Sequence, residues 1–266
     1  MKYGVRAIFP RRIINPIESE NELYTAVTHR WSQFKRSPRP NTAINQSVIY
    51  CWRFPMLEKL NDPAFRTVSR PDGSVMNYLG QILTYEANPV FYEIGVGVGA
   101  TTLSVAKLLN NHGKIVLFSR EQDVRELAAD LSNEGFNNIE SSWGSPNKIY
   151  SGYHFELARG LVEDLLPPFD LAYIDGGHVF HLDAPAACIL KELCKPGGFM
   201  IFDDWTWSLA ISPTLQPSKR PRTKDEYDDR QIEACHVQLV CKALMDTDPR
   251  FEFVALEKDS AVYRRR

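Results

Sequence analysis

Short apolar runs alternate with amphipathic segments along most of the chain after residue 73. The apolar runs are continuous, which is typical of parallel strands that are covered on both faces. We expect five such strands, at residues 89–94, 113–119, 138–142, 169–175 and 196–204. The other segments have helical periodicity, and we expect helices at residues 74–87, 100–111, 121–135, 184–195 and 232–246. Strands that alternate with helices in this way indicate βαβ units and a parallel sheet.

The end of the chain has a different pattern. Two short apolar segments, residues 251–257 and 261–265, are separated by three residues, a connection that is typical of an antiparallel hairpin. The predicted fold is therefore α/β: a Rossmann-like, doubly wound sheet of seven strands, mostly parallel with an antiparallel terminal hairpin.

The first 72 residues lack this regularity. They are irregular and punctuated by prolines, with one helix expected at residues 18–34. We interpret residues 1–72 as an N-terminal appendage to a domain at residues 73–266, and we expect it to contribute to a substrate site or to an interface in a homo-oligomer. Residues 205–229 form a long stretch without a regular pattern. Because such stretches in compact domains are often functional, we interpret this one as a lid over the substrate.

A glycine-rich turn stands between the first predicted strand and the next helix. Gly95, Gly97 and Gly99 have the spacing of turns whose backbone closely approaches a cofactor. Either a dinucleotide or S-adenosylmethionine fits such a turn. Glu93, just ahead of the glycines, favours S-adenosylmethionine, because a carboxylate attracts its ammonium group and would repel a pyrophosphate. Thr101, in the first turn of the helix, is a further candidate for binding the cofactor.

The end of the second predicted strand supports a different cofactor. It holds Ser119 and Arg120 where an acidic residue usually binds the ribose hydroxyls. A serine–arginine pair at this position suits the 2′-phosphate of NADP. Glu121, two positions after Ser119, is an alternative partner for the ribose. Both cofactors therefore stay open at this point.

Carboxylates gather where the fourth and fifth predicted strands end. The fourth ends in Asp175, followed by His178, and the fifth ends in Asp203 and Asp204. Because ligands of open α/β sheets bind outside the carboxyl ends of the strands, we expect these side chains to share one crevice. A divalent cation such as Mg²⁺ would relieve the repulsion among the carboxylates. We predict a cation bound by the three aspartates, and a catalytic pair of His178 and Asp175 in which histidine, a residue that titrates near neutral pH, is the base.

A second histidine lies close to this pair. His181 and Asp183 are near His178 in the sequence. No cysteine or third histidine is placed to complete a zinc site with them. We therefore interpret His181 and Asp183 as surface or helix-capping groups.

The composition is ordinary for a globular protein, with 44% hydrophobic residues, 24% charged residues and a net charge of −2. This charge gives no reason to expect a nucleic acid or an anionic membrane as a partner. No apolar stretch predicts a secretory signal or a membrane span. The five cysteines form no CxxC motif, so we expect a cytoplasmic chain with reduced thiols.

Three segments in succession, YEIGVGVGATTLSVAKLL, FDLAYIDGGHVF and LCKPGGFMIFDDW, resemble class I S-adenosylmethionine-dependent methyltransferases. The likeness covers roughly residues 75–265 and is greatest to the metal-dependent branch that includes macrolide-sugar O-methyltransferases. It implies that Glu93 and the three glycines bind the cofactor, that the three aspartates hold Mg²⁺, and that His178 is the general base. Ser119 and Ser145, the latter near the usual adenine site, depart from the family, which commonly has acidic residues at these two places.

The resemblance implies methyl transfer to a hydroxyl group of a small molecule, such as a sugar, a polyketide or a catechol-like acceptor. Two alternatives remain. An NADP-dependent oxidoreductase would explain Ser119 and Arg120 but not the three aspartates. A non-catalytic protein that retains the fold would explain the missing acidic residues but not the intact set of aspartates.

Overall fold

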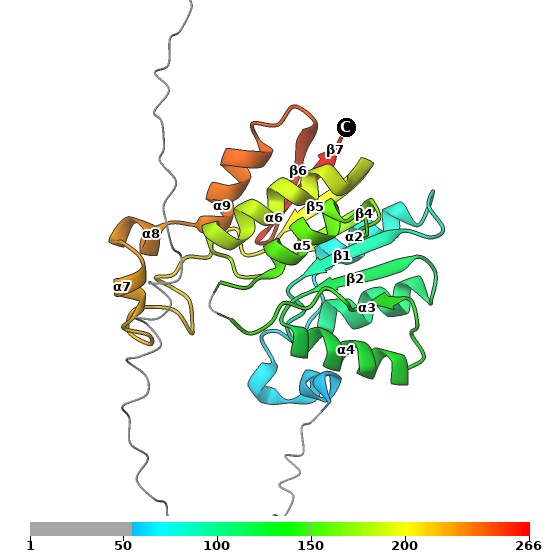
Figure 1. Ribbon diagram of the computed structural model, residues 1–266, viewed down its shortest axis with the longest axis horizontal. Coiled ribbons are helices and arrows are strands. Elements are labelled where there is room, and N and C mark those ends of the chain that lie inside the picture. The colour runs from blue at the N-terminus through cyan, green and yellow to red at the C-terminus, as the bar shows by residue number, and fades with distance from the viewer. Residues whose placement is uncertain (1–54, 149) are drawn as a thin grey trace, which may run out of the picture. The chain divides into compact units, whose positions relative to one another are not determined.

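The computed structural model describes residues 55–148 and 150–266, and within them seven strands form one sheet in the order β3-β2-β1-β4-β5-β7-β6. The strands are β1 (Val90–Ile94), β2 (Lys114–Phe118), β3 (Ile139–Glu140), β4 (Phe169–Ile174), β5 (Cys194–Phe202), β6 (Phe251–Glu257) and β7 (Ser260–Arg265). The first five are parallel, and β7 runs antiparallel to both β5 and β6. The predicted fold class is therefore confirmed (Figure 1).

Successive residues of the central strands face opposite sides of this sheet. Tyr92 and Ile94 of β1 pack into one apolar cluster, whereas Phe91 packs into another. Both faces of the strand are thus buried, which explains why its sequence is a continuous apolar run. Glu93 interrupts that run, and alternation along the strand places it on the same side as Phe91.

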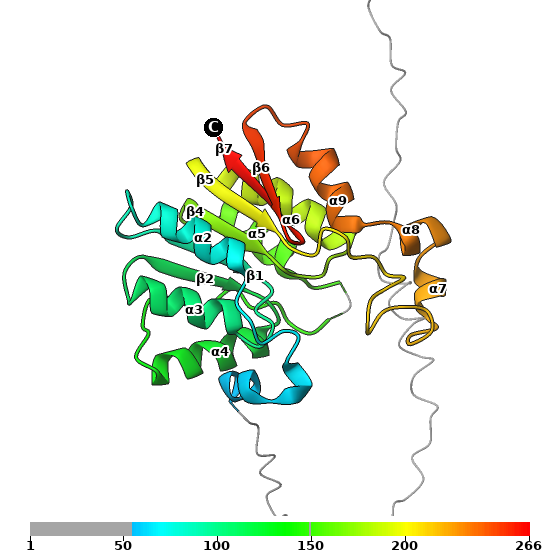
Figure 2. The ribbon, with the colours of Figure 1, turned by 180° about the vertical axis from the view of Figure 1, so that it is seen from behind.

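Helices cover both faces of the sheet. The face toward the viewer in Figure 1 carries α5 (Tyr153–Val162), α6 (Phe180–Leu193) and α9 (His236–Val240). The opposite face, brought forward in Figure 2, carries α2 (Gly73–Ile82), α3 (Ala100–Leu109) and α4 (Glu121–Asn133). The arrangement is the doubly wound one that the alternation of strands and helices predicted.

Two helical regions differ from the prediction. Helix α5 was not predicted at all. The single helix predicted at residues 232–246 is divided into α8 (Asp229–Glu233), α9 and the π-helical turn η3 (Cys241–Met245). The His236 ring lies 2.6 Å from the carbonyl oxygen of Gln231. That oxygen would accept the backbone N–H of Cys235 in a continuous helix, so the side-chain contact replaces a helical bond where α8 ends.

Part of the predicted appendage packs on the domain. The short helices η1 (Met56–Asn61) and η2 (Pro63–Phe65) precede α2. Met56 is buried in the cluster beneath α2, α3 and α4, and the backbone N–H of Leu57 donates to Asp130 Oδ2 at 3.0 Å. The helix predicted at residues 18–34 lies outside the described residues.

The segment interpreted as a lid, residues 205–229, is held against α6 at several points. Leu209 is buried with Val179 and Ile232 in a small third cluster. The segment contains the short helix α7 (Thr223–Glu226), and Asp228 closes a capping box at the start of α8. Its first residue, Trp205, donates its backbone N–H to the carbonyl oxygen of Asp259 at 2.8 Å.

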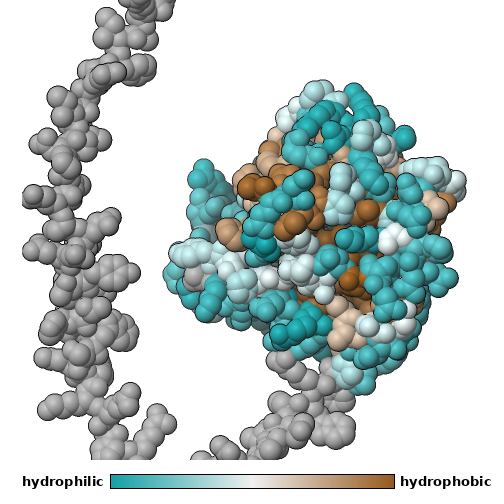
Figure 3. Space-filling model, turned by 45° about the vertical axis from the view of Figure 1, so that its right-hand side comes forward, coloured by the Kyte–Doolittle hydropathy of each residue, from teal (hydrophilic) through white to brown (hydrophobic). Residues whose placement is uncertain are grey.

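Figure 3 shows that hydrophobic residues reach the surface in the middle of the face in view, while most of the remainder of that face is hydrophilic. The exposed apolar side chains include Phe253 and Leu256 of the edge strand β6 and Val162 of α5. In the described part of the chain, no helix has the length and apolar character needed to cross a bilayer.

Candidate active site

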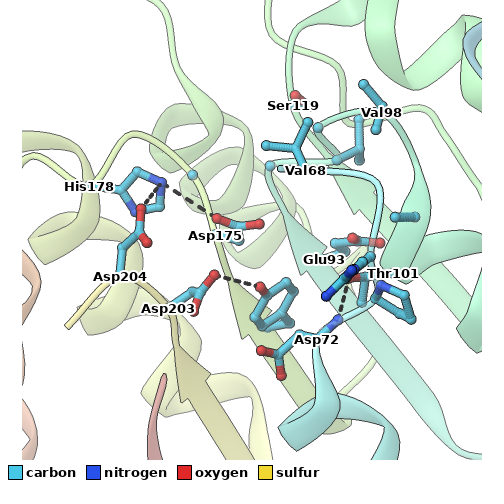
Figure 4. A pocket seen from close by; sticks show the side chains of 18 of the residues that line it. Val68, Asp72, Glu93, Val98, Thr101, Ser119, Asp175, His178, Asp203 and Asp204 are labelled. Atoms are coloured by element: carbon cyan, nitrogen blue, oxygen red, sulfur yellow. Dashed lines mark hydrogen bonds and ion pairs between the residues drawn. The ribbon is translucent and has the colours of Figure 1, made fainter. Parts of the chain in front are cut away.

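A cavity of about 540 Å³ opens at the carboxyl ends of β1, β4 and β5, and Figure 4 shows side chains from these strand ends and from the segment ahead of α2 directed toward it. Its volume is typical of small-molecule sites. Most of the predicted site residues line it: Glu93, Gly95, Gly97, Thr101, Ser119, Arg120, Asp175, His178, Asp203 and Asp204. The other three predicted residues, Gly99, Glu121 and Ser145, are not among its lining residues.

The glycine turn after β1 is built for close backbone approach. Gly95 has a φ of +85°, and a Cβ atom there would lie 2.0 Å from the carbonyl oxygen of Asp175. Gly97 also has a positive φ, +49°, but a Cβ atom there would meet nothing within 4 Å. Gly95 is therefore needed so that β1 and β4 can approach each other, whereas the missing side chain of Gly97 leaves space inside the cavity. Gly99 is the N-cap of α3 and packs on Leu127.

Glu93 is the buried carboxyl group beneath this turn. It is 2% exposed, and its Oε2 accepts a hydrogen bond of 2.6 Å from the hydroxyl of Thr102. Burial raises the pKa of Glu93 to about 8, although the Thr102 hydrogen bond acts in the opposite direction. A carboxyl group that is costly to ionise because it is buried would gain from a cationic ligand.

Glu93 should therefore make stability depend on pH. Because the pKa is raised from 4.5 to about 8 on folding, only the folded protein holds this proton between those values, and its contribution to the free energy of unfolding falls as pH rises through that window. We expect Glu93→Gln to be more stable than wild type near pH 8 and to have a flatter profile. Urea unfolding of the ligand-free protein from about pH 5 to pH 8.5 measures this. Parallel profiles for the two proteins would contradict the raised pKa.

The end of β2 offers little support for an NADP site. Arg120 forms an ion pair with Asp123 at 2.6 Å, and its side chain is 70% exposed. Its positive charge is therefore already paired and lies in solvent. Ser145 is buried and donates both its N–H and its hydroxyl to the carbonyl oxygen of Ser119, at 2.8 and 3.2 Å. Glu121 lies in a neighbouring cavity of about 400 Å³.

His178 lies between two of the strand-end aspartates. Its Nε2 is 3.5 Å from Asp175 Oδ1 and 3.4 Å from Asp204 Oδ2 (Figure 4). The sequence prediction that β4 and β5 bring these residues together is correct for this trio. The ring also packs on Trp207 of the lid segment, with 5.6 Å between ring centroids.

Negative charge is concentrated around Asp175. Burial raises its pKa well above the ordinary value, and the charges of Asp203, Asp204 and Glu93 raise it further. Burial also raises the pKa of Asp204, an effect that His178 opposes. The end of the sheet is thus a place where a cation would lower the electrostatic free energy.

Asp203 is turned toward different partners. Its Oδ2 accepts from the hydroxyl of Tyr173 at 2.8 Å, and its Oδ1 accepts from the hydroxyl of Ser260 at 2.7 Å. The Ser260 hydroxyl also lies 3.2 Å from Asp72 Oδ2. Asp72 in turn caps α2 through Val75 N–H and donates its own N–H to Thr101 Oγ1. These hydrogen bonds connect the end of β5 to the helix that follows the glycine turn.

The three aspartates predicted as cation ligands line one cavity but are not gathered around one point. Among residues 55–148 and 150–266, no three histidine, cysteine, aspartate or glutamate side chains are arranged to hold a metal ion. Their oxygen donors nevertheless suit Mg²⁺, which retains waters and needs few carboxylates. The cation site stays a prediction, and occupancy would require the side chains to move closer together.

Sequence reasoning missed several residues of the cavity, among them Asp72, Tyr173 and Lys258. Asp72 stands ahead of a helix and could have been recognised as an N-cap, but nothing local indicates its proximity to Asp203. Asp183, interpreted as a surface or capping group, is in fact buried at 2% exposure. That interpretation was wrong because the burial is created by α5, the helix that was not predicted.

Two functional candidates have an unusual backbone. His178 and Asp204 have φ values of 53° and 59°, in the left-handed region that non-glycine residues seldom adopt. Such conformations cost on the order of 1 to 3 kcal/mol, persist only where the surroundings enforce them, and cluster at active sites. Both residues lie at the tips of adjacent strands, so the backbone there is shaped to direct side chains into the cavity.

Comparisons with known proteins find a methyltransferase family over the strands that form this cavity, and solved methyltransferases with a similar fold. The family described as "Methyltransferase domain" matches residues 92–205. An O-methyltransferase from Bacillus cereus in complex with SAH is similar in structure, with a TM-score of 0.51, 16% identity, and coverage of 82% of this chain and 94% of that one. The MycE methyltransferase of the mycinamycin biosynthetic pathway, in complex with Mg, SAH and mycinamycin VI, has a TM-score of 0.50 and 19% identity, covering 80% of this chain and 56% of that one. No curated protein matches the chain by sequence.

The family match spans the glycine turn, Asp175, His178 and the paired aspartates. The sheet places an antiparallel β7 between β5 and β6, unlike the dinucleotide-binding order 3-2-1-4-5-6. Residues 92–205 therefore match a methyltransferase domain, and the fold is shared with solved O-methyltransferases, in agreement with the resemblance of the strand-end motifs.

Proposed function

We propose that this protein methylates a hydroxyl group of a small molecule, with S-adenosylmethionine as donor and with a divalent cation such as Mg²⁺ held by Asp175, Asp203 and Asp204. The observation that carries the proposal is the convergence of an open glycine turn, a histidine and strand-end carboxylates on one cavity. When bound, the donor supplies an electrophilic methyl group, and the cation favours the ionised form of the hydroxyl.

Two features support the donor site. The space at Gly97 lets a ligand approach the backbone, and the buried Glu93 suits a ligand with an ammonium group, which would stabilise the ionised carboxylate. The SAH in the B. cereus and MycE structures is in keeping with this assignment.

His178 is the group that accepts the proton of the acceptor hydroxyl. Its Nε2 faces the cavity between Asp175 and Asp204, at 3.5 and 3.4 Å. Two nearby carboxylates stabilise the imidazolium that forms, and proton removal makes the hydroxyl oxygen nucleophilic. In-line methyl transfer otherwise depends mainly on positioning.

The lid segment supports a small, ring-containing acceptor. Trp205 and Trp207 follow directly after Asp204, and Trp207 packs on the His178 ring. An acceptor that approaches His178 from the side of the lid segment would meet Trp207, whose aromatic face suits the ring of a sugar, a polyketide or a catechol-like molecule.

The cofactor assignment is tested by calorimetry with SAH, NADP and MgCl₂ on the full chain. We expect SAH to bind and NADP not to bind. Binding of NADP without SAH would support an oxidoreductase, and binding of neither would support a non-catalytic protein. Incubation with labelled S-adenosylmethionine and a panel of sugars, polyketides and catechols then tests methyl transfer.

The cation assignment is tested by Asp203→Asn, which keeps the shape of the side chain and one acceptor oxygen but removes the charge and replaces the second oxygen by an N–H donor. We expect Mg²⁺ affinity in titrations with MgCl₂ to fall more than about tenfold, because even the loss of a partner that supports a metal ligand costs roughly 10- to 100-fold. SAH affinity should stay near the wild-type value. The matched control is Asp246→Asn, because Asp246 also accepts a tyrosine hydroxyl, that of Tyr263, at 2.7 Å. Equal Mg²⁺ affinity in all three proteins would exclude Asp203 as a ligand.

A further inference from the structure

Tyr153, the first residue of α5, forms a buried pair with Asp183 of α6. The Tyr153 hydroxyl donates a short hydrogen bond to Asp183 Oδ1. Tyr153 is 7% exposed and Asp183 is 2% exposed. Neither residue lines the cavity, so neither has a part in binding or catalysis as described above.

The pair holds the turn between Asp175 and His178. The backbone N–H of Gly177 donates to the Tyr153 hydroxyl oxygen at 3.0 Å. The tyrosine ring lies so close to the backbone that a Cβ atom on Gly176 would come within 2.8 Å of it. The hydroxyl therefore accepts from the turn and donates to the carboxylate, and both of its hydrogen-bonding functions are used.

The turn needs such support because of the residue that follows. His178 has a left-handed backbone, with a φ of 53°, which a non-glycine residue adopts only where its surroundings enforce it. Its ring is nevertheless placed between Asp175 and Asp204 and against Trp207. The N–H immediately ahead of His178, that of Gly177, donates to the Tyr153 hydroxyl at 3.0 Å and also interacts with the Asp183 carboxylate.

A purely structural role for the pair would be to satisfy two buried polar groups. The chain contains such a pair elsewhere, Tyr263 with Asp246, which joins β7 to the end of η3 away from the cavity. The third group at the Tyr263 hydroxyl is the side chain of Cys241, whereas the third group at the Tyr153 hydroxyl is the backbone of the histidine turn.

We infer that Tyr153 and Asp183 are positioning residues, which hold the Gly176–Gly177 turn so that the His178 ring is directed between the strand-end aspartates. Only the expected effect on kcat rests on the proposed function of His178. The position of the His178 ring does not depend on the reaction and is tested separately.

The geometric test uses NMR on the full chain, with histidine and tryptophan side chains isotopically labelled. In wild type we expect cross-relaxation between the His178 and Trp207 rings. In Tyr153→Phe we expect this signal to be lost or strongly reduced, because the Gly177 N–H loses its 3.0 Å hydrogen bond to the hydroxyl and Asp183 loses its tyrosine partner. The matched control, Tyr263→Phe, should retain it. Retention of the wild-type signal in Tyr153→Phe would overturn the inference.

A second variant covers the case in which Tyr153→Phe does not fold. Asp183→Asn can still accept the tyrosine hydroxyl through its amide oxygen, and we expect it to keep the ring–ring signal. Asp183→Ala cannot accept it, and we expect it to lose the signal. Equal signals in these two variants would overturn the inference.

The kinetic test uses whichever acceptor of the panel is methylated. We expect Tyr153→Phe to lower kcat by about 10- to 100-fold, because a misplacement of about 1 Å can cost on the order of 100-fold. KM for S-adenosylmethionine and the Kd for SAH should stay within about twofold, since neither residue lines the cavity. A fall in kcat no larger than that of Tyr263→Phe would overturn the catalytic consequence. Lack of turnover by wild type would instead count against the proposed function and leave the NMR result to decide the positioning role.

Discussion

Replacement of His178 by glutamine is expected to lower kcat by roughly 10²- to 10⁴-fold, the usual contribution of a general base. Glutamine can occupy the space between Asp175 and Asp204 and can donate a hydrogen bond, but it cannot accept a proton at the pH of the reaction. The measurement is single-turnover methyl transfer at saturating donor and acceptor, which separates the chemical step from product release.

Binding provides the internal control for this prediction. SAH affinity should be little changed in His178→Gln, because the cofactor is assigned to the glycine turn. His112→Gln, an exposed histidine outside the cavity, should have wild-type kcat. A His178→Gln protein with wild-type kcat would show that another group removes the proton.

The second large effect is expected for Gly97→Ala. The added methyl group would project into the cavity, where it meets no protein atom within 4 Å but would overlap a cofactor lying on the turn. Overpacking by small groups costs about 1 to 3 kcal/mol, which corresponds to a loss of SAH affinity of roughly 5- to 150-fold. Calorimetry with SAH measures this loss directly.

The control must separate this overlap from backbone strain. Gly135 also has a positive φ, +92°, and open space around its Cβ position, but it lies outside the cavity. We expect Gly135→Ala to lower stability at least as much as Gly97→Ala, because the φ of residue 135 is further from the left-handed region that alanine can adopt. We also expect Gly135→Ala to bind SAH with wild-type affinity. Similar SAH affinities in the two variants would mean that no ligand lies against Gly97.

The sheet could be predicted from sequence because its strands are buried on both faces. Phe91 and Tyr92 enter different apolar clusters, so the sequence of β1 is apolar at successive positions except for Glu93. The cavity could be predicted because the carboxyl ends of parallel strands share one edge, which brought Asp175 and Asp204 to His178. These inferences depend only on the periodicity of strands and on their direction.

Helix α5 was missed because its surface does not follow the usual division into polar and apolar faces. Its buried positions include Tyr153, Leu157 and Gly160, whereas Phe155 and Val162 are exposed at 62% and 86%. Large apolar residues on the solvent side and a glycine on the inner side weaken the periodic pattern that identifies an amphipathic helix.

The orientation of Asp203 could not be predicted for a different reason. Its partners come from the preceding strand, through Tyr173, and from the terminal hairpin, through Ser260. Ser260 also contacts Asp72, which is 188 positions away. No local sequence pattern predicts a contact over such a separation. The hydrogen-bond partners of the Asp203 carboxylate could therefore be identified only from the tertiary structure.

The position of β7 has a consequence for how the sheet is completed. Among the strands of residues 55–148 and 150–266, β7 lies between β5 and β6 and pairs with both, while β6 pairs only with β7. During synthesis β6 emerges before the strand that joins it to the sheet exists. β6 and β7 must therefore join the sheet together, and Asp203 gains its Ser260 partner only in that final step.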